Sequence, residues 1–550
     1  MASTLRAQIH NSLAAVRDVF SNRDIRRVQF AFAGSIVGYY AYLTAVAVYA
    51  FHHGGATAVG VLTFVRLAVA AVISPLAASI GDRYRRERVM IGSDLARAAT
   101  VSVAAVAVFT GAPSLVVYAL ATLATAVGTP FRPAEAALLP TLARSPEELT
   151  AANLSSSTFD SVGLFAGPAL GAALLIVGGP GTVFCVTVAT FVWSALLLTA
   201  VHTAPPAAAT EDDQEEHRGV WAGVRAIRAE PRLRLVIGLY GGQCIVAGIF
   251  NVLLVATALD LLDLGNAGVG LLDAVVGVGA LIGAAVVLTL VGRKRLAADF
   301  GLGLVLVSSP LVVLAVLPNT AVALVSFAMI GVGNTMVDVT AVTLVQRTSP
   351  REVVGRVFGV LESTLVGALG AGALLAPALI AGIGIRGGLL VAGVTLPALT
   401  VLCWRRLAVV DAGAGVPEDR LAAVRQVSFL ATLPLPAIEG LAAGLERVEL
   451  ADGEVLFERG AIGDRFFIVA EGAVEIDLPE GVKIDRAPCY LGEIALLHDI
   501  PRTATVRAAE PSILWALERD DFLNAVLGHA RSHRAAGEIA SARLGAPAGP

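Results

Sequence analysis

The sequence has little charge for its length. Asp, Glu, Lys and Arg make up 15% of its 550 residues, whereas the apolar set AVILMFWYC makes up 56%, and the mean hydropathy is +0.76. Soluble domains average about 25% charged and 45–50% apolar residues. The composition therefore excludes an ordinary soluble protein and places most of the chain in lipid. With no basic face, nucleic acid is not expected as a partner.

Cysteine is also scarce, and the four that occur are Cys185, Cys244, Cys403 and Cys489. Three lie in apolar stretches and none have the spacing of metal ligands, so small buried side chains are expected and no metal site. No Walker motif for ATP is present. No catalytic residues, cofactor or enzymatic activity are therefore expected.

The first 27 residues lack the apolar core and the cleavage site of a secretory signal. We expect 1–27 to be a cytoplasmic N-terminal segment. Its apolar spacing fits a basic amphipathic helix at the membrane surface, and a frayed charged tail fits equally well.

Long apolar runs are abundant. A bilayer core about 30 Å thick needs about 20 apolar residues in a helix, and twelve such runs predict a polytopic α-helical membrane protein with twelve transmembrane helices. They cover 28–51, 56–81, 89–110, 114–131, 154–178, 181–203, 233–258, 267–291, 298–317, 320–345, 354–382 and 387–404.

Arginine is distributed unevenly between the two sides of these runs. The loops DRYRRER (82–88) and GRKR (292–295) are basic, whereas FHHGGA (51–56) and GAPS (111–114) carry no arginine, and Arg386 is the only one on their side. Because cytoplasmic loops collect Lys and Arg, both termini are expected in the cytoplasm, with the chain in the cell (inner) membrane.

A long loop at 204–232 divides the runs into two groups of six. It begins with a Pro/Ala-rich acidic stretch and continues into a basic amphipathic helix. We expect two six-helix bundles, 28–203 and 233–406, joined by this cytoplasmic linker. Such a 6+6 layout favours a duplicated carrier with its cargo site between the halves.

Two short motifs lie in the first half. Asp82, Arg83 and Arg86 follow the second run, where a carboxylate and arginines can form a latch between the halves. Alternatively, the arginines only satisfy the charge rule.

In GLFAGPALGA (163–172), Gly163, Gly167 and Gly171 recur every four residues and give a smooth face for close helix packing, while Pro168 adds a bend. Ordinary small-residue packing is the alternative reading.

Both motifs resemble signatures of the major facilitator superfamily. The first is similar to its cytoplasmic gate motif G-x-x-x-D-R-x-G-R, although Ala78 and Arg85 replace the two glycines, and the second is similar to its antiporter motif. The segments 131–172, 94–98 and 344–359 resemble the drug-efflux branch, which includes macrolide and siderophore exporters. The resemblance spans about 28–405 and implies an exporter of a small amphipathic solute.

Ionisable residues at membrane depth are candidates for function. Arg66 and Glu362 are expected at a similar level. The resemblance implies that the second and eleventh helices lie close together, and we therefore predict a pair between the halves. Asp94 and Arg97, three residues apart, are expected to satisfy each other. Asp160, Asp273 and Asp338 could bind a proton or cargo, although a structural role is favoured for each. Tyr39 and Tyr40 could line a cargo cavity.

The composition changes after Arg406. We expect a linker at 407–423 and a cytoplasmic α+β domain at 424–545, a β-roll with flanking helices. Helices are predicted at 420–432 and 434–445, and strands near 446–450, 454–458, 465–470 and 472–478.

The segment YLGEIALLHDIPRTATV (490–506) resembles the phosphate-binding cassette of cyclic nucleotide-binding domains, and 463–476 resembles the preceding strand-turn-strand of that family. Arg502 supplies a planar guanidinium that can hold two phosphate oxygens. Gly492 permits close backbone approach, and 492–497 is expected to start a helix whose free amides face the phosphate.

The resemblance implies further contacts. The amides of Ile494, Ala495 and Ala504 would bind the phosphate, and Glu493 would accept a hydrogen bond from the ribose 2′-hydroxyl. Thr503 stands where base choice is influenced, which leaves cAMP and cGMP open, with cAMP favoured as the regulatory ligand.

A long terminal helix is expected at 519–543, and the resemblance implies that it closes over the base. Phe522, Val526 and Leu527 would pack on the roll, and Ile539 would be the lid.

Together these features predict a proton-driven exporter that alternates access and is regulated when the nucleotide repositions the terminal helix. Two alternatives stay open: a membrane-anchored nucleotide sensor without transport, and a carrier of the nucleotide itself. The cargo, the coupling ion, the sign of regulation and the oligomeric state do not follow from the sequence.

Overall fold

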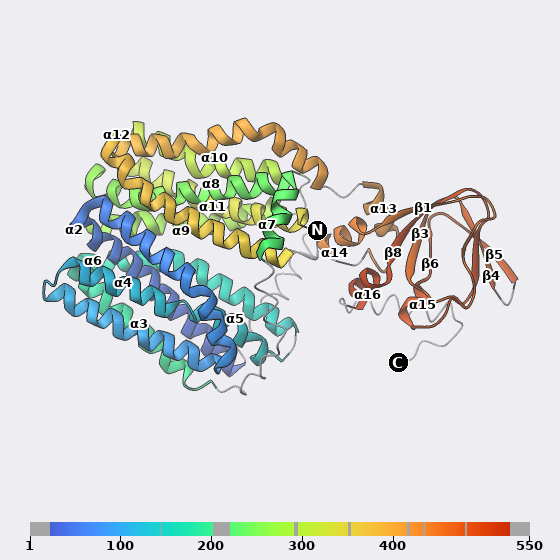
Figure 1. Cartoon of the computed structure of the whole chain (residues 1–550), viewed down its shortest axis with the longest axis horizontal. Coiled ribbons are helices and arrows are strands. Elements are labelled where there is room, and N and C mark those ends of the chain that lie inside the picture. The colour runs from blue at the N-terminus through green and yellow to red at the C-terminus, as the bar shows by residue number, and fades with distance from the viewer. Residues whose placement is uncertain are drawn as a thin grey trace. The chain divides into compact units, whose positions relative to one another are not determined.

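The computed structural model describes residues 22–144, 146–201, 220–290, 295–349, 354–414, 418–431, 433, 435–478 and 481–527. The chain divides into two compact units, Met1–Asp411 and Ala412–Pro550. The described part of the first is helical, and the second holds the strands (Figure 1).

The first unit is built from long helices and a few short ones. They are α2 (Arg23–Arg83), α3 (Arg86–Phe109), α4 (Ser114–Gly128), α5 (Phe131–Leu142), α6 (Pro146–Leu198), α7 (Val220–Ala229), α8 (Pro231–Ala256), the π-helix η3 (Thr257–Leu261), α9 (Gly265–Leu290), α10 (Leu296–Val316), α11 (Thr320–Thr348) and α12 (Val354–Ala414).

Three of these helices contain a break at glycine. The backbone is non-helical at Gly54 and Gly55 in α2, at Gly178 and Gly179 in α6, and at Gly384 in α12. The second glycine of each pair, and Gly384, have φ of 59°, 70° and 72°, a left-handed conformation that glycine adopts without a steric penalty. Each break falls between two of the apolar runs predicted from the sequence.

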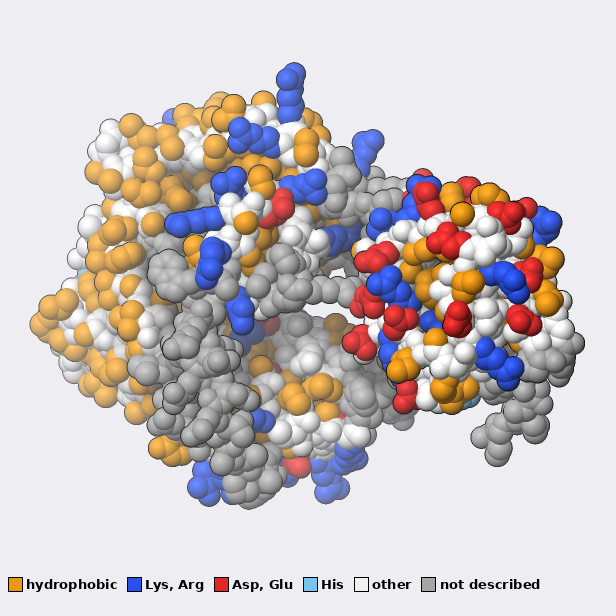
Figure 2. Space-filling view, turned by 45° about the vertical axis from the view of Figure 1, so that its right-hand side comes forward, with side chains coloured by type: hydrophobic (Ala, Val, Ile, Leu, Met, Phe, Trp, Pro, Cys, Tyr) orange, Lys and Arg blue, Asp and Glu red, His pale blue; other side chains and the backbone are white. Residues whose placement is uncertain are grey.

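Within the described residues, nine helices are long and apolar enough to cross a membrane. Their outward side chains are apolar: Val72, Leu115, Val177 and Leu402 are 74–80% exposed, and hydrophobic side chains cover much of this unit's visible surface (Figure 2). Such a surface is unfavourable in water and suits lipid. The chain is therefore a multi-pass membrane protein.

Glycines bring the helices of each group close together. A Cβ at Gly167 of α6 would collide with the Tyr40 side chain and lie 2.8 Å from Val37 O, both in α2. In the second group, a Cβ at Gly248 of α8 would collide with Leu369 O of α12. The first and fifth predicted runs of each group are thus in backbone contact.

The two groups of helices also meet through glycines. A Cβ at Gly60 of α2 would collide with Ala373 O of α12, and a Cβ at Gly270 of α9 would lie 2.6 Å from Pro168 O of α6. Gly277, two turns further along α9, would bring a Cβ to 2.7 Å from Phe165 Cα. Small residues at these crossings permit close packing.

The second unit contains two four-stranded antiparallel sheets. Their strand orders are β1-β8-β3-β6 and β2-β7-β4-β5. The strands are β1 (Glu446–Leu450), β2 (Val455–Phe457), β3 (Arg465–Glu471), β4 (Ala473–Leu478), β5 (Gly481–Arg486), β6 (Cys489–Leu491), β7 (Thr505–Ala508) and β8 (Ser512–Glu518). The first four agree closely with the strands predicted from the sequence.

Four short helices flank the sheets: α13 (Glu418–Gln426), α14 (Leu435–Ala443), α15 (Glu493–Leu497) and α16 (Arg519–Leu527). Phe522 and Val526 of α16 are fully buried, and the ring of Phe522 stacks on Phe466 at 4.6 Å. The predicted packing of these two residues on the roll is thus present. Leu527 has no described side chain, and Ile539 with the remainder of the predicted terminal helix lies outside the described residues.

Two predicted boundaries change. The helix expected at 420–432 ends at Gln426, because the chain turns there to bury Phe429 and Leu430 in the core of the roll. The linker expected at 407–423 is largely helical, since α12 continues to Ala414 and α13 begins at Glu418.

Candidate functional site

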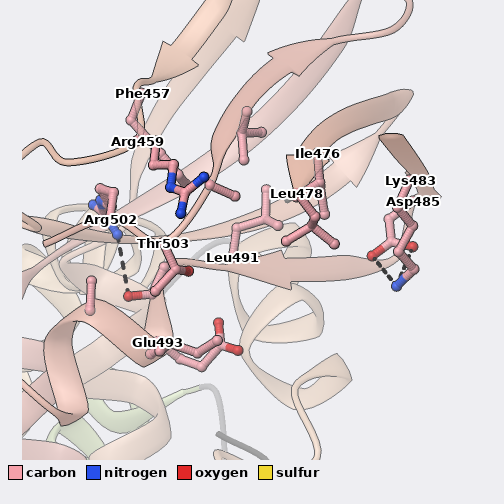
Figure 3. A pocket seen from close by; sticks show the side chains of 15 residues that line it. Phe457, Arg459, Ile476, Leu478, Lys483, Asp485, Leu491, Glu493, Arg502 and Thr503 are labelled. Carbon is pink, nitrogen blue, oxygen red and sulfur yellow. Dashed lines mark hydrogen bonds and ion pairs between the residues drawn. The ribbon is translucent and has the colours of Figure 1, made fainter. Parts of the chain in front are cut away.

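The seven residues assigned to nucleotide binding line one pocket of the second unit, with a volume of about 700 Å³ (Figure 3). The residue after β6, helix α15 and the segment just before β7 contribute them, so a single stretch of chain forms one wall. These seven are Gly492, Glu493, Ile494, Ala495, Arg502, Thr503 and Ala504.

Gly492 connects β6 to α15 in a left-handed conformation with φ of 90°. A Cβ there would collide with Arg502 Nη1 and lie 3.1 Å from Arg465 O. Both the backbone conformation and the close approach require glycine. The first amides of α15 have no carbonyl partner within their helix, and Glu493 at its first position is buried at 1% exposure.

Arg502 is buried in the wall of the pocket at 3% exposure. Its Nη1 donates to Gly492 O at 3.2 Å and its Nη2 to Arg465 O at 2.7 Å. The guanidinium lies 4.3 Å from the centre of the Phe457 ring, and Nη2 is 3.7 Å from Asp464 Oδ1. Four neighbours therefore hold its plane in place.

Burial lowers the pKa of Arg502, while the nearby carboxylates of Asp464 and Glu493 oppose this shift. An arginine nevertheless keeps its charge in proteins. Its buried Nε has no hydrogen-bond partner among the described residues. A fixed cation with an unused donor beside a glycine bend is suited to a phosphate group.

The far end of the pocket was not predicted. Ile476 and Leu478 of β4 supply apolar surface, and Lys483 and Asp485 of β5 form an ion pair with Nζ 3.0 Å from Oδ2. In Figure 3 these residues lie away from Arg502. The remaining lining residues are Phe457, Arg459, Leu491 and Val506. The only available signal was strand pairing, because β5 pairs with the predicted strand β4.

Arg519 links the pocket to helix α16. Its Nη1 donates to Gly463 O at 3.1 Å, its Nη2 lies 2.5 Å from Asp499 Oδ1, and its backbone amide donates to Asp464 O at 2.8 Å. Asp499 follows α15, and Asp464 faces Arg502. One side chain at the start of α16 thus contacts both segments around the phosphate end.

Of the two motifs predicted in the membrane unit, the antiporter-like glycines lie at helix contacts and the gate residues lie at the end of α2 and the start of α3. The glycines Gly163, Gly167 and Gly171 face α2, where Cβ atoms at them would meet Ile36, Tyr40 and Ala41, and the carbonyl of Pro168 contacts α9. Asp82 and Arg83 end α2, where the structure does not describe side chains. Arg86 Nη1 donates to Ala137 O of α5 at 2.6 Å, within the first half.

The pair predicted between Arg66 and Glu362 is not formed. Arg66 Nε donates to Thr125 Oγ1 at 2.9 Å. Arg66 lies eleven residues after the break at Gly55, whereas Glu362 lies eight residues after the start of its helix at Val354, and the two helices run antiparallel. At about 1.5 Å per residue they occupy different levels, which the prediction misjudged.

Asp273 is the carboxylate that shares a cavity with Arg66. This cavity of about 280 Å³ is lined by α2 and α6, which precede the 204–232 segment, and by α8 and α9, which follow it. Tyr40 also lines it, and Thr44 Oγ1 donates to Asp273 Oδ2 at 3.4 Å. Tyr39 and Tyr40 both line a second cavity of about 230 Å³ within the first half.

Three other membrane-depth carboxylates have side-chain partners. Asp94 and Arg97 form the expected contact, with Ser35 bonded to both. Arg132 Nη2 lies 2.5 Å from Asp160 Oδ1. In the second half, Tyr240 donates to Asp338 Oδ1 at 2.8 Å.

Comparison with known families finds two matches along the chain. The model described as Major Facilitator Superfamily matches residues 28–373, and the model described as Cyclic nucleotide-binding domain matches residues 447–529. The two matches fall on the helical and the strand-containing unit respectively.

Individual relatives match over about a fifth of this chain. An uncharacterised protein of Mycobacterium tuberculosis is 38% identical over 117 residues, which is 22% of its length. A cAMP-dependent protein kinase regulatory subunit of Yarrowia lipolytica is 35% identical over 100 residues, 26% of its length. The acetyltransferase Pat of Mycolicibacterium smegmatis is 37% identical over 114 residues, 34% of its length.

Among solved structures, a POT family transporter in complex with a thioalcohol-conjugated peptide superposes with a TM-score of 0.58 at 13% identity. The match covers 70% of this chain and 96% of that one. A POT family transporter in complex with 5-aminolevulinic acid gives the same TM-score at 12% identity. These similarities show a shared helical fold.

Proposed function

Since the chain belongs to the major facilitator superfamily and carries a cyclic nucleotide-binding domain, we propose that it is a secondary active transporter under nucleotide control. It acts as an efflux antiporter of a small amphipathic solute in the inner membrane, with both termini in the cytoplasm. The observation that carries regulation is the convergence of all seven cassette residues on one pocket around buried Arg502.

The phosphate, the ribose and the base of the nucleotide are each assigned to a different region of the pocket. The cyclic phosphate lies between Arg502 and the amides of Ile494, Ala495 and Ala504, where Gly492 leaves room for it. Glu493 accepts from the ribose 2′-hydroxyl. The base extends toward β4 and β5, because the rest of the pocket volume lies there.

Thr503 is the residue proposed to influence base choice. Its hydroxyl lines the pocket beside Arg502 and would reach the amino group of guanine. We favour cAMP, in keeping with the kinase regulatory subunit of Yarrowia lipolytica that carries cAMP dependence in its name. Isothermal titration of the purified full-length protein with cAMP and cGMP tests the choice directly.

The membrane unit is proposed to contain twelve spans in two halves, 28–203 and 233–406. Dividing α2, α6 and α12 at their glycine breaks turns nine apolar helices of the described residues into twelve. The glycine contacts repeat with the same order in each half: first helix with fifth, and second helix of one half with fifth of the other. This repetition supports an internal duplication with the cargo cavity between the halves.

Transport follows from alternating access to this cavity, powered by a proton gradient. The glycine-lined crossings of α2 with α12 and of α9 with α6 let the halves rock on smooth surfaces. The gate residues Asp82, Arg83 and Arg86 are proposed to latch the cytoplasmic mouth, where the basic loops lie. The reaction moves a solute and changes no covalent bond, so no catalytic residue is required.

Regulation is proposed to pass from the phosphate site to α16. Arg519 contacts Gly463 and Asp499 on both sides of that site, so movement around a bound phosphate is transmitted to the helix. A ligand shifts a gate only if it binds one gate state better than the other. Couplings of about 1–3 kcal/mol are typical.

The competing proposal is a membrane-anchored nucleotide sensor without transport. It shares the pocket and lacks alternating access. Binding of the nucleotide with no change of gate conformation would favour the sensor, whereas a change of conformation favours the regulated transporter.

A further inference from the structure

The cavity between the halves carries one charge of each sign. Among its described lining residues, Arg66 of α2 is the only cation and Asp273 of α9 is the only carboxylate. They come from different halves of the membrane unit. Each is only partly exposed, so neither is a surface charge in bulk solvent.

The two side chains occupy similar levels in the membrane. Arg66 lies eleven residues after the break at Gly55, and Asp273 lies eight residues after the start of α9 at Gly265. With a rise of about 1.5 Å per residue, these positions are roughly 16 Å and 12 Å from the same side. The two charged side chains therefore lie at a similar depth in the membrane unit.

Neither charge is neutralised by the protein. No ion pair involving Arg66 or Asp273 occurs within 4.0 Å among the described residues, and each has a single hydroxyl partner, Thr125 and Thr44 respectively. By contrast, Arg97 and Arg132 in the same half are paired with carboxylates. Unpaired charges at membrane depth are unfavourable and mark functional sites.

We propose that this cavity binds a small zwitterion, with its anionic group at Arg66 and its cationic group at Asp273. The assignment rests on the proposed transport function and specifies its cargo class. Apolar side chains such as Leu43, Leu62 and Leu254 line the rest of the wall and contact the uncharged body of the solute. The volume of about 280 Å³ lies just below the range of roughly 300–1,000 Å³ for drug-sized ligands, which fits a solute of amino-acid size.

The test uses probes that differ only in charge. Purified full-length protein in detergent is melted with alanine, leucine or phenylalanine, each as the zwitterionic amino acid, the cationic amide and the anionic N-acetyl derivative at about 10 mM. Because a ligand that binds the folded state raises Tm, at least one zwitterion is expected to raise Tm by about 2–5 °C. Its amide and N-acetyl forms are expected to raise Tm by less than half as much.

Two variants assign the charges. Asp273→Asn is expected to weaken binding of the zwitterion at least tenfold while the N-acetyl anion is unaffected, and Arg66→Gln is expected to spare the amide cation instead. Asp273→Glu keeps the carboxylate and should retain the preference for the zwitterion. Asp160→Asn removes a membrane carboxylate that does not line this cavity and serves as the matched control.

The assignment is overturned if none of the nine probes raises Tm, or if the three charge classes act equally. It is also overturned if Asp160→Asn alters selectivity as strongly as Asp273→Asn. A variant that does not fold is recognised by the Tm without probe, and Asp273→Glu then decides. Failure of the proposed function is distinguishable, because it leaves cyclic nucleotide without effect on gate conformation, whichever solutes bind.

Discussion

The nucleotide pocket and the membrane cavity differ in how their residues are distributed along the chain. The charged and glycine residues of the proposed phosphate site lie within 490–506 and are brought together by β6, α15 and β7. Arg66 and Asp273 are separated by some two hundred residues and line one cavity only because the distant helices α2 and α9 pack near each other. A local site is readable from a motif, whereas a site between distant helices depends on tertiary packing.

The comparison predicts that the local site depends on single side chains. Arg502→Ala is expected to weaken cAMP binding by about 100-fold or more, because it removes a buried charged partner of the phosphate. Isothermal titration of the full-length protein measures this change. The matched variant Arg507→Ala removes an arginine of β7 that pairs with Glu475 outside the pocket, and should leave Kd within twofold.

If Arg502→Ala binds cAMP as well as the unchanged protein, the cassette assignment is wrong. If both arginine variants lose binding, the roll has been destabilised and the test returns to Arg502→Lys. Lysine retains the charge without the planar fork, so an intermediate loss is expected there.

A substitution that disturbs helix packing in the membrane unit should leave nucleotide binding unaffected. Gly167→Ala places a Cβ against Tyr40 and the backbone of α2, and is expected to lower Tm by about 5 °C because overpacking costs on the order of 1–3 kcal/mol. Gly238→Ala in α8, where a Cβ meets nothing within 4 Å, is the control and should leave Tm unchanged or slightly raised. Equal effects of the two substitutions would contradict the proposed close helix contact.

A substitution of Arg519 tests whether nucleotide binding in the pocket is coupled to helix α16. Arg519→Gln is expected to weaken cAMP binding less than about fivefold, since its side chain does not line the pocket. The same variant should lose the effect of cAMP on gate conformation. Retention of that effect with unchanged magnitude would exclude Arg519 from the route, and Arg447→Gln, whose partner is Glu449 on the same strand, provides the control.

Base choice should show the smallest effect. Thr503→Ala is expected to weaken cGMP binding by roughly three- to tenfold, the value of one hydrogen bond, and to leave cAMP within twofold. Thr505→Ala on β7, which does not line the pocket, is the control. An equal loss for both nucleotides would assign Thr503 to the phosphate rather than to the base.

Much of the fold could be predicted because the apolar composition and the spacing of apolar residues along the chain indicate membrane helices and strands. The apolar runs end near the glycine breaks, and Gly492, with its φ of 90°, was marked by the motif in which it stands. Lys483 and Asp485 were missed because a short hairpin strand has no chemical signature until its pairing with β4 is known.

The predicted pair between Arg66 and Glu362 is absent for a geometric reason. Helices that run in opposite directions place residues at equal distances from their N-termini on opposite sides of the bilayer. Equal counts from the helix starts put Glu362 at the level of Arg66, although their helices run antiparallel. The helix that carries Asp273 starts on the same side as the helix that carries Arg66. The sequence alone does not show which helices line one cavity.

The most direct test of nucleotide control is the gate itself, measured without knowledge of the cargo. Spin labels at Arg88→Cys of α3 and Arg234→Cys of α8, in a background without the four native cysteines, report the distance between the two proposed halves at the proposed cytoplasmic gate. Saturating cAMP is expected to change the ratio of the two distance populations by roughly 5- to 150-fold, and Arg502→Ala is expected to abolish the change. Identical distributions with and without bound cAMP would contradict the regulated transporter.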